Sequence, residues 1–512
     1  MRKLFALLAI AVTASANDLS YKTLQSGPNG LTTPLFDHGL HGEGQIIAVL
    51  DTGVDYTSCY FAEPDGSPPP INTVDLSRRK IIAYDFLYDN PNSPNAYDNQ
   101  GHGTHAAASA VGDRGTPIVH DSGDAIAPAA KLIVQDAGYT GGDACSQRPG
   151  IGCPVNITPI LDQAYQQGAR IHSNSWGDAQ GSPFAPPTAN YPQSARDVDA
   201  FVYSHPDMLI VFNTGNWGGT TSLALPSSLS APGAAKNTLD VGGTRDANRY
   251  ADDVLARFTL FGPTRDGRIK PDVVGPAYVV AGDAQVIIKG NTCGTTPQLG
   301  TSWAAPTIAG AAALVRQYYT DGFYPTGIAT PTNRMTPSAA LLKATIIAAA
   351  RRVPQIVTPT GLQDTKPVPS NEQGWGFPVL DDALYFPGDV SKLRMQDNQS
   401  LVEGESNTMQ LNVKPDAPLK VILVWTDPPG VPLVNDLDLR VVDPAGNQLA
   451  PADHVNNVEG VSIAQPLSGN YTITVSASRL GQGPWQNYAL VVTGDVADAA
   501  QPQPLRTRAA RH

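Results

Sequence analysis

Residues 131–216 alternate between short apolar runs and runs with helical spacing, and this alternation constrains the fold more than any other feature of the chain. Apolar, β-branched runs predict strands, whereas apolar residues three and four positions apart predict helices. The expected strands are 131–134, 169–177 and 208–212, and the expected helices are 157–167 and 194–203. Such a strand–helix repeat predicts an α/β domain in which helices cover both faces of a parallel sheet.

Two expected strands end in polar residues that lie next to glycine. The apolar run 46–50 leads into Asp51, and the run 208–212 leads into the segment 213–216, which ends in Asn216. Ligands bind at the carboxyl ends of strands in open α/β sheets, so Asp51 and Asn216 are candidate site residues. Each segment taken alone is also compatible with an ordinary turn rich in Asp, Asn and Gly.

Two further candidates stand at the expected starts of helices rich in small residues. His102 lies between two glycines and precedes an alanine-rich run, in which His105 is expected to pack rather than to take part in chemistry. Ser302 follows Gly300, which allows a close backbone approach, and Thr301, which is expected to cap the helix. Because a helix N-terminus favours negative charge, Ser302 stands where the oxyanion formed by attack on a carbonyl would be stabilised.

After about residue 390 the pattern changes to short strand-like runs separated by turns. Strands are expected at 409–413, 419–425, 437–442, 461–463, 471–476 and 485–492. Regularly spaced short strands predict a β-sandwich or jelly roll of about 100 residues. We therefore expect an α/β domain at 17–388 and a β-sandwich domain at 395–495, followed by a disordered tail at 496–512 that is rich in Ala, Pro and Arg.

The N-terminal segment has the three parts of a secretory signal peptide. A positively charged start is followed by the apolar run 4–12 and by the small residues Ala14-Ser15-Ala16. We expect residues 1–16 to be removed after Ala16 and the protein to be extracellular; a buried N-terminal helix is the alternative. The apolar run is too short to span a bilayer, and no membrane span is expected elsewhere.

The four cysteines of the chain suggest two disulfides, because an even number is typical of proteins from an oxidising compartment. Cys145 and Cys153 lie in one loop rich in Gly and Pro and are expected to pair with each other. Cys59 would then pair with Cys293 by elimination, with buried free thiols as the alternative for this distant pair. No Cys/His cluster has the spacing of a zinc site.

Asp51, His102 and Ser302 together supply the acid, the base and the nucleophile that acyl transfer requires, in the chain order Asp, His, Ser. At these residues the chain resembles the subtilisin-like serine proteases. The segments that carry the resemblance are 51–54, 101–105, 215–216 and 300–306, within a matching region from about residue 40 to residue 385. Four such motifs in one order make a coincidental match of turns and helix starts a poor explanation.

The resemblance implies a role for each residue. Ser302 Oγ would attack the scissile carbonyl, and His102 would accept its proton and pass it to the leaving amine. Asp51 would hold the imidazole in the required tautomer. Asn216 and the backbone N–H of Ser302 would form the oxyanion hole. No cofactor is implied for catalysis.

The same resemblance implies a site for an extended peptide. Ser175, Trp176 and Gly177 look like the edge strand that pairs with the substrate backbone, and Thr214 and Gly215 look like part of the pocket wall for the residue before the cleaved bond. The expected partners are protein or peptide substrates, and we expect a monomer. A formal net charge of −12 argues against nucleic acid as a partner.

The C-terminal half is similar to that of an alkaline-protease branch in which a jelly-roll domain follows the catalytic domain. The segments that carry this similarity are 424–429, 435–439 and 456–459. The branch implies structural calcium, and the carboxylate and amide oxygens of these segments suit Ca²⁺. A solvated acidic loop without an ion is the alternative.

Two features depart from the family pattern. Trp303 follows the nucleophile at a position where many family members have Met. Because Met oxidises to a polar sulfoxide, we expect this chain to tolerate peroxide better than they do. In addition, residues 17–50 are too few for the usual folding-assistant prodomain, since chains below about 40 residues rarely fold alone.

Two other classes of function remain to be weighed against a protease. A secreted binding protein with an inactive protease domain would not need the intact set Asp51, His102, Asn216 and Ser302. A non-proteolytic serine hydrolase is expected to place its serine in a Gly-x-Ser-x-Gly elbow, which Ser302 lacks. The sequence therefore predicts a secreted serine endopeptidase with a parallel-sheet α/β catalytic domain of the subtilisin-like type and a C-terminal antiparallel β-sandwich of the jelly-roll type.

Overall fold

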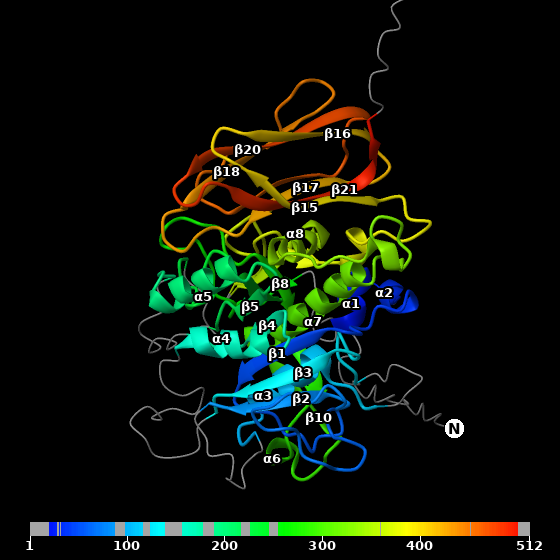
Figure 1. Cartoon of the computed structure of the whole chain (residues 1–512), viewed down its shortest axis with the longest axis vertical. Helices are drawn as coiled ribbons and strands as arrows, with labels where there is room; N and C mark the ends of the chain where they lie inside the picture. Colours follow the sequence, from blue (N-terminus) through cyan, green and yellow to red (C-terminus); the bar gives the residue numbers. More distant parts are fainter. Residues whose placement is uncertain are drawn as a thin grey trace, which may run out of the picture.

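The computed structural model describes residues 20–27, 30, 32–87, 98–115, 123–138, 156–177, 189–216, 226–244, 254–358, 360–450 and 452–499. An α/β part and a β-sandwich are stacked along the long axis of the molecule (Figure 1). The expected signal peptide at 1–16 and the expected pair Cys145 and Cys153 lie outside the described residues.

A largely parallel sheet forms the centre of the α/β part. Its strands are β1 (Ile46–Asp51), β2 (Ile81–Phe86), β3 (Lys131–Asp136), β4 (Ile171–Asn174), β5 (Leu209–Asn213), β6 (Leu239–Thr244), β7 (Val254–Leu255), β8 (Val273–Pro276), β12 (Gln355–Thr358) and β13 (Gly361–Asp364). They lie in the order β13-β12-β7-β6-β5-β4-β1-β3-β2, and β8 pairs with β6. Strands β2, β3, β1, β4, β5 and β6 pair in parallel, which confirms the predicted α/β class.

Helices cover this sheet. The longer ones are α3 (His102–Val111), α4 (Ile157–Gln166), α5 (Gln193–Ser204), α7 (Thr301–Thr320) and α8 (Ala339–Ala349). The short ones are α1 (Ser20–Ser26), α2 (Pro34–Asp37), α6 (Gln285–Ile288), η1 (Pro331–Asn333) and η2 (Leu380–Asp382). Helix α7 packs on α3 and crosses β4, β5, β6 and β8. Ile160 of α4 packs with Leu50 of β1 in a separate cluster, so helices lie on both faces.

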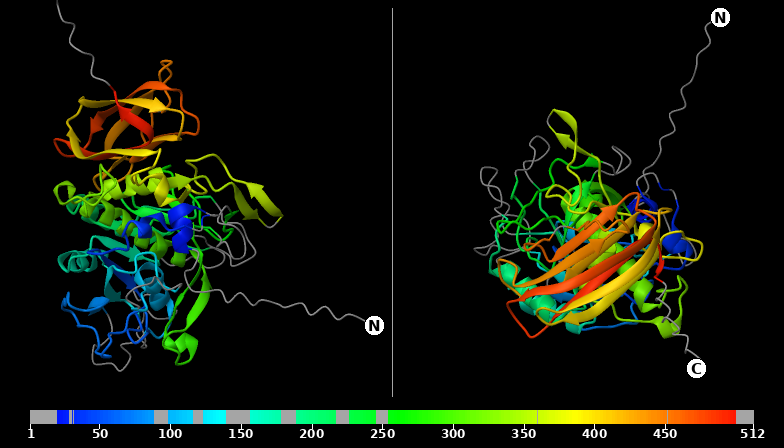
Figure 2. Two further views of the ribbon diagram at one scale, coloured as in Figure 1. Left: turned by 90° about the vertical axis from the view of Figure 1, so that its right-hand side faces the viewer. Right: turned by 90° about the horizontal axis from the view of Figure 1, so that it is seen from above.

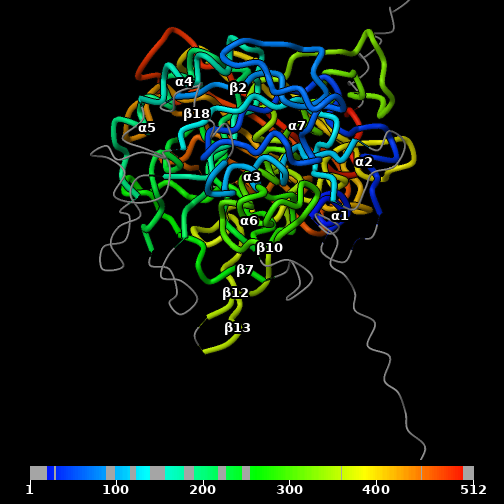
Figure 3. Tube along the Cα trace, turned by 90° about the horizontal axis from the view of Figure 1, so that it is seen from below, coloured from blue at the N-terminus to red at the C-terminus, as the bar shows by residue number. Residues whose placement is uncertain are grey.

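Three smaller hairpins complete the α/β part. Strands β9 (Tyr278–Gly282) and β10 (Thr295–Leu299) pair just before α7, and α6 lies between them. The disulfide Cys59–Cys293, which confirms the prediction, joins this hairpin to the loop after β1. The short strands β11 (Ala350–Arg351) and β14 (Phe377–Pro378) pair with each other, and the hairpin β12–β13 projects from the body (Figures 2 and 3).

The sandwich is built from antiparallel strands that confirm the second predicted architecture. They are β15 (Lys392–Leu401), β16 (Ser406–Lys414), β17 (Leu419–Trp425), β18 (Asn435–Val442), β19 (Val458–Ile463), β20 (Gly469–Leu480) and β21 (Gln486–Asp498). One layer is β15-β21-β17-β19 and the other is β18-β20-β16, and β21 also pairs with β16, so that it joins the two.

The expected disordered tail at 496–512 begins too early. Strand β21 runs to Asp498, and Val496 is buried opposite Val413 of β16. The Ala-rich composition suggested a tail, but backbone pairing with β16 keeps these residues in the sheet. The sandwich also begins at Lys392, just before the expected start at 395.

The two parts share a continuous apolar core. Helix α8 packs on β17 and β21, whose Ile422, Val424, Ala489 and Val491 belong to the core of the α/β part. Strands β17 and β21 are therefore buried on both faces. Figure 2 shows from the side how this layer of the sandwich lies on the α/β part. None of the helices in the described part of the chain has the length and apolar character needed to cross a membrane.

Candidate active site

Asp51 and His102 form a direct pair between the end of β1 and the start of α3. The distance from His102 Nδ1 to Asp51 Oδ1 is 2.6 Å, and the same Oδ1 accepts a hydrogen bond from the Thr52 N–H at 2.8 Å. The Asp51 side chain is 1% exposed, whereas the imidazole is 33% exposed. The acid is thus buried beneath a base that substrate can reach.

Two glycines allow this pair to form. Gly101, just before α3, has a φ of +79°, which glycine adopts at little cost. At Gly103 a Cβ would lie 2.1 Å from the carbonyl oxygen of Gly53, so a side chain there would collide with backbone. The first turn of α3 can therefore press against the loop that follows Asp51.

Asp98 is a site residue that the sequence reasoning missed. Its carboxylate accepts hydrogen bonds from Thr52 Oγ1 at 2.9 Å, from Gly101 N at 2.9 Å and from Thr104 N at 2.8 Å. Burial raises the pKa of Asp98 to about 6. The residue fastens the loop after Asp51 to the first turn of α3. Its position just before a helix start, where acids are favoured, was the available signal.

Ser302 is the second residue of α7, and Pro306, one turn later, leaves the Ser302 carbonyl oxygen without its usual helical hydrogen bond. Pro306 has no N–H to donate to the carbonyl of Ser302, so this carbonyl accepts a hydrogen bond from Ser175 Oγ at 2.7 Å instead. In return, Ser302 Oγ lies 3.5 Å from the carbonyl oxygen of Ser175. The predicted substrate segment after β4 therefore contacts the predicted nucleophile directly.

The expectation that Thr301 caps α7 is wrong. Gly300 occupies the cap position in an extended conformation, and Thr301 is the first helical residue. Its N–H and hydroxyl both donate to Asn216 Oδ1, at 2.8 and 3.0 Å. Because Oδ1 is held in this way, Nδ2 of Asn216 remains available as a donor beside Gly300, where a Cβ would lie 3.5 Å from it.

The other predicted substrate residues lie near these groups but differ in exposure. Trp176 and Gly177 follow β4, and the Trp176 ring packs edge-on against Phe212 with centroids 5.4 Å apart. Thr214 is fully buried after β5, and its carbonyl accepts a hydrogen bond from Ser230 N at 3.1 Å. Gly215 is buried beside it, and the next residue, Asn216, is exposed.

The surroundings of the two histidines of α3 shift their pKa values in opposite directions. Burial by itself lowers the pKa of His102, but the adjacent Asp51 carboxylate outweighs this effect, and the pKa is raised. His105 is completely buried, with Nε2 3.1 Å from the carbonyl oxygen of Thr296, and burial lowers its pKa to about 3. This confirms the packing role expected for His105, and positive charge can develop on His102 alone of the two.

Trp303 connects the starts of α3 and α7. It follows Ser302 directly, and its indole centroid lies 4.8 Å from that of His102. The segment that carries the Ser302 hydroxyl thus contacts both the imidazole of His102, through Trp303, and the amide of Asn216, through Thr301. Such an arrangement can activate a hydroxyl for attack on a carbonyl and stabilise the negative charge that results.

Comparison with known proteins agrees with this chemistry. The model of the subtilase family of peptidases matches residues 42–376. The serine protease/ABC transporter B family protein tagD of Dictyostelium discoideum is 26% identical over 630 residues, covering 94% of this chain and 33% of its own length. The thermophilic serine proteinase of Bacillus sp. (strain AK1) is 29% identical, covering 58% of this chain and 59% of its own.

Among solved structures, the serine protease of Aeromonas sobria covers 94% of this chain and 94% of its own, with 17% identity and a TM-score of 0.43. The chain spans about a third of the length of the Dictyostelium relative. The family match covers most of the α/β part, including β1, α3 and the start of α7. The chain therefore belongs to the subtilase family, a family of serine endopeptidases.

Proposed function

We propose that this chain is a secreted serine endopeptidase that hydrolyses peptide bonds in protein or peptide substrates through Asp51, His102 and Ser302. The observation that carries the proposal is the 2.6 Å contact between a buried carboxylate and a half-buried imidazole, next to the helix start that holds Ser302. The family of the chain supports the same reaction.

In this mechanism His102 is the general base. Its Nδ1 is bonded to Asp51, so in the neutral imidazole Nδ1 carries the proton and Nε2 is the free acceptor. Nε2 takes the proton of Ser302 Oγ as that oxygen attacks the carbonyl carbon, and returns it to the leaving amine. Water then hydrolyses the acyl-enzyme by the same steps in reverse order.

The negative oxygen formed during attack is placed at the start of α7. Asn216 Nδ2 donates to it, together with the backbone N–H of Ser302, which has no acceptor within the helix at this position. Residues 175–177 hold the substrate backbone, and Thr214 and Gly215 support the pocket for the residue before the cleaved bond. These roles rest on the contacts of Ser175 with Ser302 and of Asn216 with Thr301.

A fluorophosphonate probe tests the proposal because it labels activated serines. Wild-type protein should be labelled, and Ser302→Ala and His102→Ala should not. Ser77→Ala, at an exposed serine that the proposal gives no role, is the matched control and should be labelled normally. Equal labelling of Ser302→Ala and wild type would contradict the proposal.

We also propose a structural calcium site in the sandwich. Ligand atoms of Asp436, Asp438 and His454 lie within 4.8 Å of one another. Among the described residues, Asp436 Oδ1, Asp438 Oδ1 and Glu459 Oε1 are buried without a hydrogen-bond partner. Carboxylate oxygens left without donors suit a hard cation, so Asp436, Asp438 and Glu459 would hold it, and the ion would neutralise their repulsion.

Chelation and pH together test this site. Burial and the neighbouring acids Asp438, Asp453 and Asp436 raise the pKa of Glu459 to about 9. The proton must leave before the ion binds, so stabilisation by calcium should grow as the pH rises toward 9. At a hundredfold excess over Kd, calcium should add about 2.7 kcal/mol of stability, measured as a loss of Tm on chelation.

Matched variants make the calcium test specific. Glu459→Gln keeps the shape of the side chain but should abolish the response to chelator, whereas Glu405→Gln, at an exposed acid of the same sandwich, should keep it. A Tm that chelator leaves unchanged in the wild type at both neutral and alkaline pH would contradict a structural calcium ion.

For the organisation of the whole chain, we propose a signal peptide at 1–16, a protease domain at 17–388 and a C-terminal domain. The strands of the sandwich support limits of 392–498 for the last. We propose that the mature protein acts as a monomer outside the cell. N-terminal sequencing of secreted protein that began at a residue other than 17 would contradict this processing.

A further inference from the structure

The indole of Trp303 lies between two imidazoles. Its ring centroid is 4.8 Å from that of His102, with an interplanar angle of 43°, and 4.3 Å from that of His105, with an angle of 58°. Trp303 is 5% exposed and packs in the core beneath the active site. Trp303 of α7 therefore contacts the His102 ring from the interior of the protein.

Packing alone does not explain an indole at this position. Among the described residues, Nε1 of Trp303 is buried and has no hydrogen-bond partner. A buried donor without an acceptor costs free energy, so an apolar side chain of similar size would fill the space at lower cost. The property that an apolar aliphatic side chain lacks is the negative face of the aromatic ring.

The charge near this ring resides on His102. The groups that face His102 are Asp51 at the end of β1, Asp98 before α3 and Asp283 after β9, all acidic, together with His105 on α3. His105 is buried and neutral. During attack on a peptide bond His102 becomes an imidazolium, and it does so within the distance of about 6 Å at which an aromatic ring attracts a cation.

We propose that Trp303 is a positioning residue that stabilises the imidazolium form of His102 through a cation–π contact, and so favours the transfer of the Ser302 proton to His102. The inference rests on the proposed function of His102. It assigns to the residue after the nucleophile an electrostatic role that a side chain without an aromatic ring would not have. Asp51 holds the imidazole at Nδ1, and Trp303 acts on the ring as a whole.

The proposal predicts a sign that distinguishes it from simple burial. A ring that only excludes water disfavours the charged imidazole, so its removal would raise the pKa of His102. A ring that attracts the cation favours the charged form, so its removal would lower the pKa. A cation–π contact in a desolvated site corresponds to a decrease of about 0.4 to 1.5 pH units.

The first experiment measures the pKa of His102 by NMR, with ¹³C-labelled histidine in the inactive Ser302→Ala protein. Trp303→Leu should lower this pKa by about 0.4 to 1.5 units, and Trp303→Phe, which keeps an aromatic face, should lower it less. The acid limb of kcat/KM in the active protein should shift by the same amount. An unchanged or raised pKa in Trp303→Leu overturns the proposal.

A second experiment keeps the side chain in place, in case Trp303→Leu does not fold. Incorporating fluorinated tryptophan weakens the negative face of the indole with little change of shape, and should lower the His102 pKa stepwise with each added fluorine. The same incorporation into Trp303→Phe is the control, because the other tryptophans then carry the fluorine and the pKa should not respond. If fluorination leaves the His102 pKa unchanged in the protein with Trp303 as well as in Trp303→Phe, the proposal is overturned.

The two experiments separate this inference from the function on which it rests. If His102→Ala retains full peptidase activity, the proposed catalytic role fails even when the NMR pKa responds to Trp303. If His102→Ala is inactive and the NMR pKa does not respond, the protease proposal stands and the cation–π contact is wrong.

Discussion

The hydrogen bonds that the Asn216 side-chain oxygen accepts set the orientation of its amide nitrogen. Thr301 donates twice to Asn216 Oδ1, and this fixes the amide with Nδ2 as its remaining donor. The residue lies at the exposed end of the segment that follows β5, so its side chain contributes little to the core. The proposed role of Asn216 in the oxyanion hole therefore makes a prediction that separates activity from stability.

We therefore expect Asn216→Ala to fold normally and to lose about 10²- to 10³-fold in kcat, because one donor to the oxyanion is gone. KM should change little, since the ground-state carbonyl depends less on this contact. Steady-state kinetics and circular dichroism provide the measurements. Asn216→Asp, which keeps the acceptor for Thr301 but replaces the donor, is the control and should be equally impaired; an Asn216→Ala enzyme with wild-type kcat would refute the assignment.

At the residue scale the sequence predicted the candidate catalytic residues better than the hydrogen bonds that hold them in place. Asp51, His102, Asn216 and Ser302 stand at strand ends and helix starts that local patterns reveal. The structure pairs Asp51 with His102 and joins Asn216 to Thr301, the residue before Ser302. The bond from Ser175 to the carbonyl of Ser302 could not be predicted, because it requires both the gap left by Pro306 and the tertiary approach of the segment after β4.

Asp98 joins the loop after β1 to the first turn of α3 through hydrogen bonds. Asp98 accepts hydrogen bonds from donors on both sides of it, which include Thr52 Oγ1 and the backbone N–H of Gly101 and Thr104. Because the carboxylate is completely buried, water cannot replace a lost acceptor. The orientation of His102 against Asp51 depends on this arrangement.

In Asp98→Asn an amide nitrogen would face backbone donors, and we expect a loss of about 1 to 3 kcal/mol in the free energy of unfolding together with a reduced kcat. Urea denaturation and kinetics at one pH measure both effects. Asp75→Asn, at an acid whose side chain is 44% exposed and which also accepts from a neighbouring backbone N–H, should leave both unchanged. Wild-type stability in Asp98→Asn would show that the carboxylate does not hold the two elements together.

At the scale of helices and strands, a prediction failed where the hydrophobic pattern of the sequence does not reveal a strand. Strand β15 was not predicted, because its sequence from Lys392 to Leu401 is mostly polar and its pairing with β21 supplies the stability. Strand β17 was predicted with its observed limits, since it is apolar except for Lys420. The reason for that apolar run, burial on both faces between the sandwich core and α8, became visible only in three dimensions.

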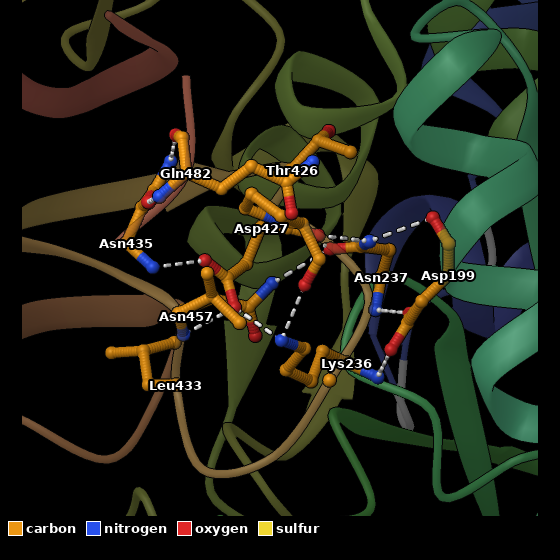
Figure 4. A network of polar contacts seen from close by, with 12 residues as sticks. Asp199, Lys236, Asn237, Thr426, Asp427, Leu433, Asn435, Asn457 and Gln482 are labelled. Atoms are coloured by element: carbon orange, nitrogen blue, oxygen red, sulfur yellow. Dashed lines mark hydrogen bonds and ion pairs between the residues drawn. The ribbon is translucent and has the colours of Figure 1, made fainter. Parts of the chain in front are cut away.

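A buried polar network joins the two parts of the molecule (Figure 4). Lys236 of the α/β part forms an ion pair with Asp427 of the sandwich, and both side chains are 0% exposed. Asn237 donates to the carbonyl of Asp427 at 2.9 Å and accepts from its N–H at 3.0 Å, and Asn457 donates to Asn237 at 3.2 Å. The sandwich is thus fixed in orientation as well as in position.

Removing one partner of this pair should destabilise the whole molecule. Asp427→Asn leaves Lys236 buried without its counter-ion, and we expect a loss of about 3 to 5 kcal/mol, measured by denaturant unfolding followed with probes in both parts. The double variant Lys236→Met/Asp427→Leu should recover most of this loss, because no charge stays buried. A cost below about 1 kcal/mol for Asp427→Asn would contradict a pair that unites the two parts.

At the scale of the molecule the sequence predicted both architectures but not how they join. The segment 424–429 indicated a C-terminal domain of the jelly-roll type, and the acids and amides near it suggested ion ligands. In the structure Asp427, Asn435 and Asn457 belong to the network around Lys236 or next to it, whereas one carboxylate oxygen each of Asp436, Asp438 and Glu459 is buried without a hydrogen-bond partner. Residue type alone could not separate these two uses.

Cleavage of a peptide library, read by mass spectrometry, tests the central claim most directly. The purified wild-type chain should produce new peptide ends with the mass of hydrolysis, and Ser302→Ala of equal fold and purity should lose about 10⁶-fold in kcat. The cleaved sequences would also show which residue is preferred before the cleaved bond. Undiminished cleavage by Ser302→Ala, or no cleavage by correctly folded wild-type protein, would contradict a serine endopeptidase built on Asp51, His102 and Ser302.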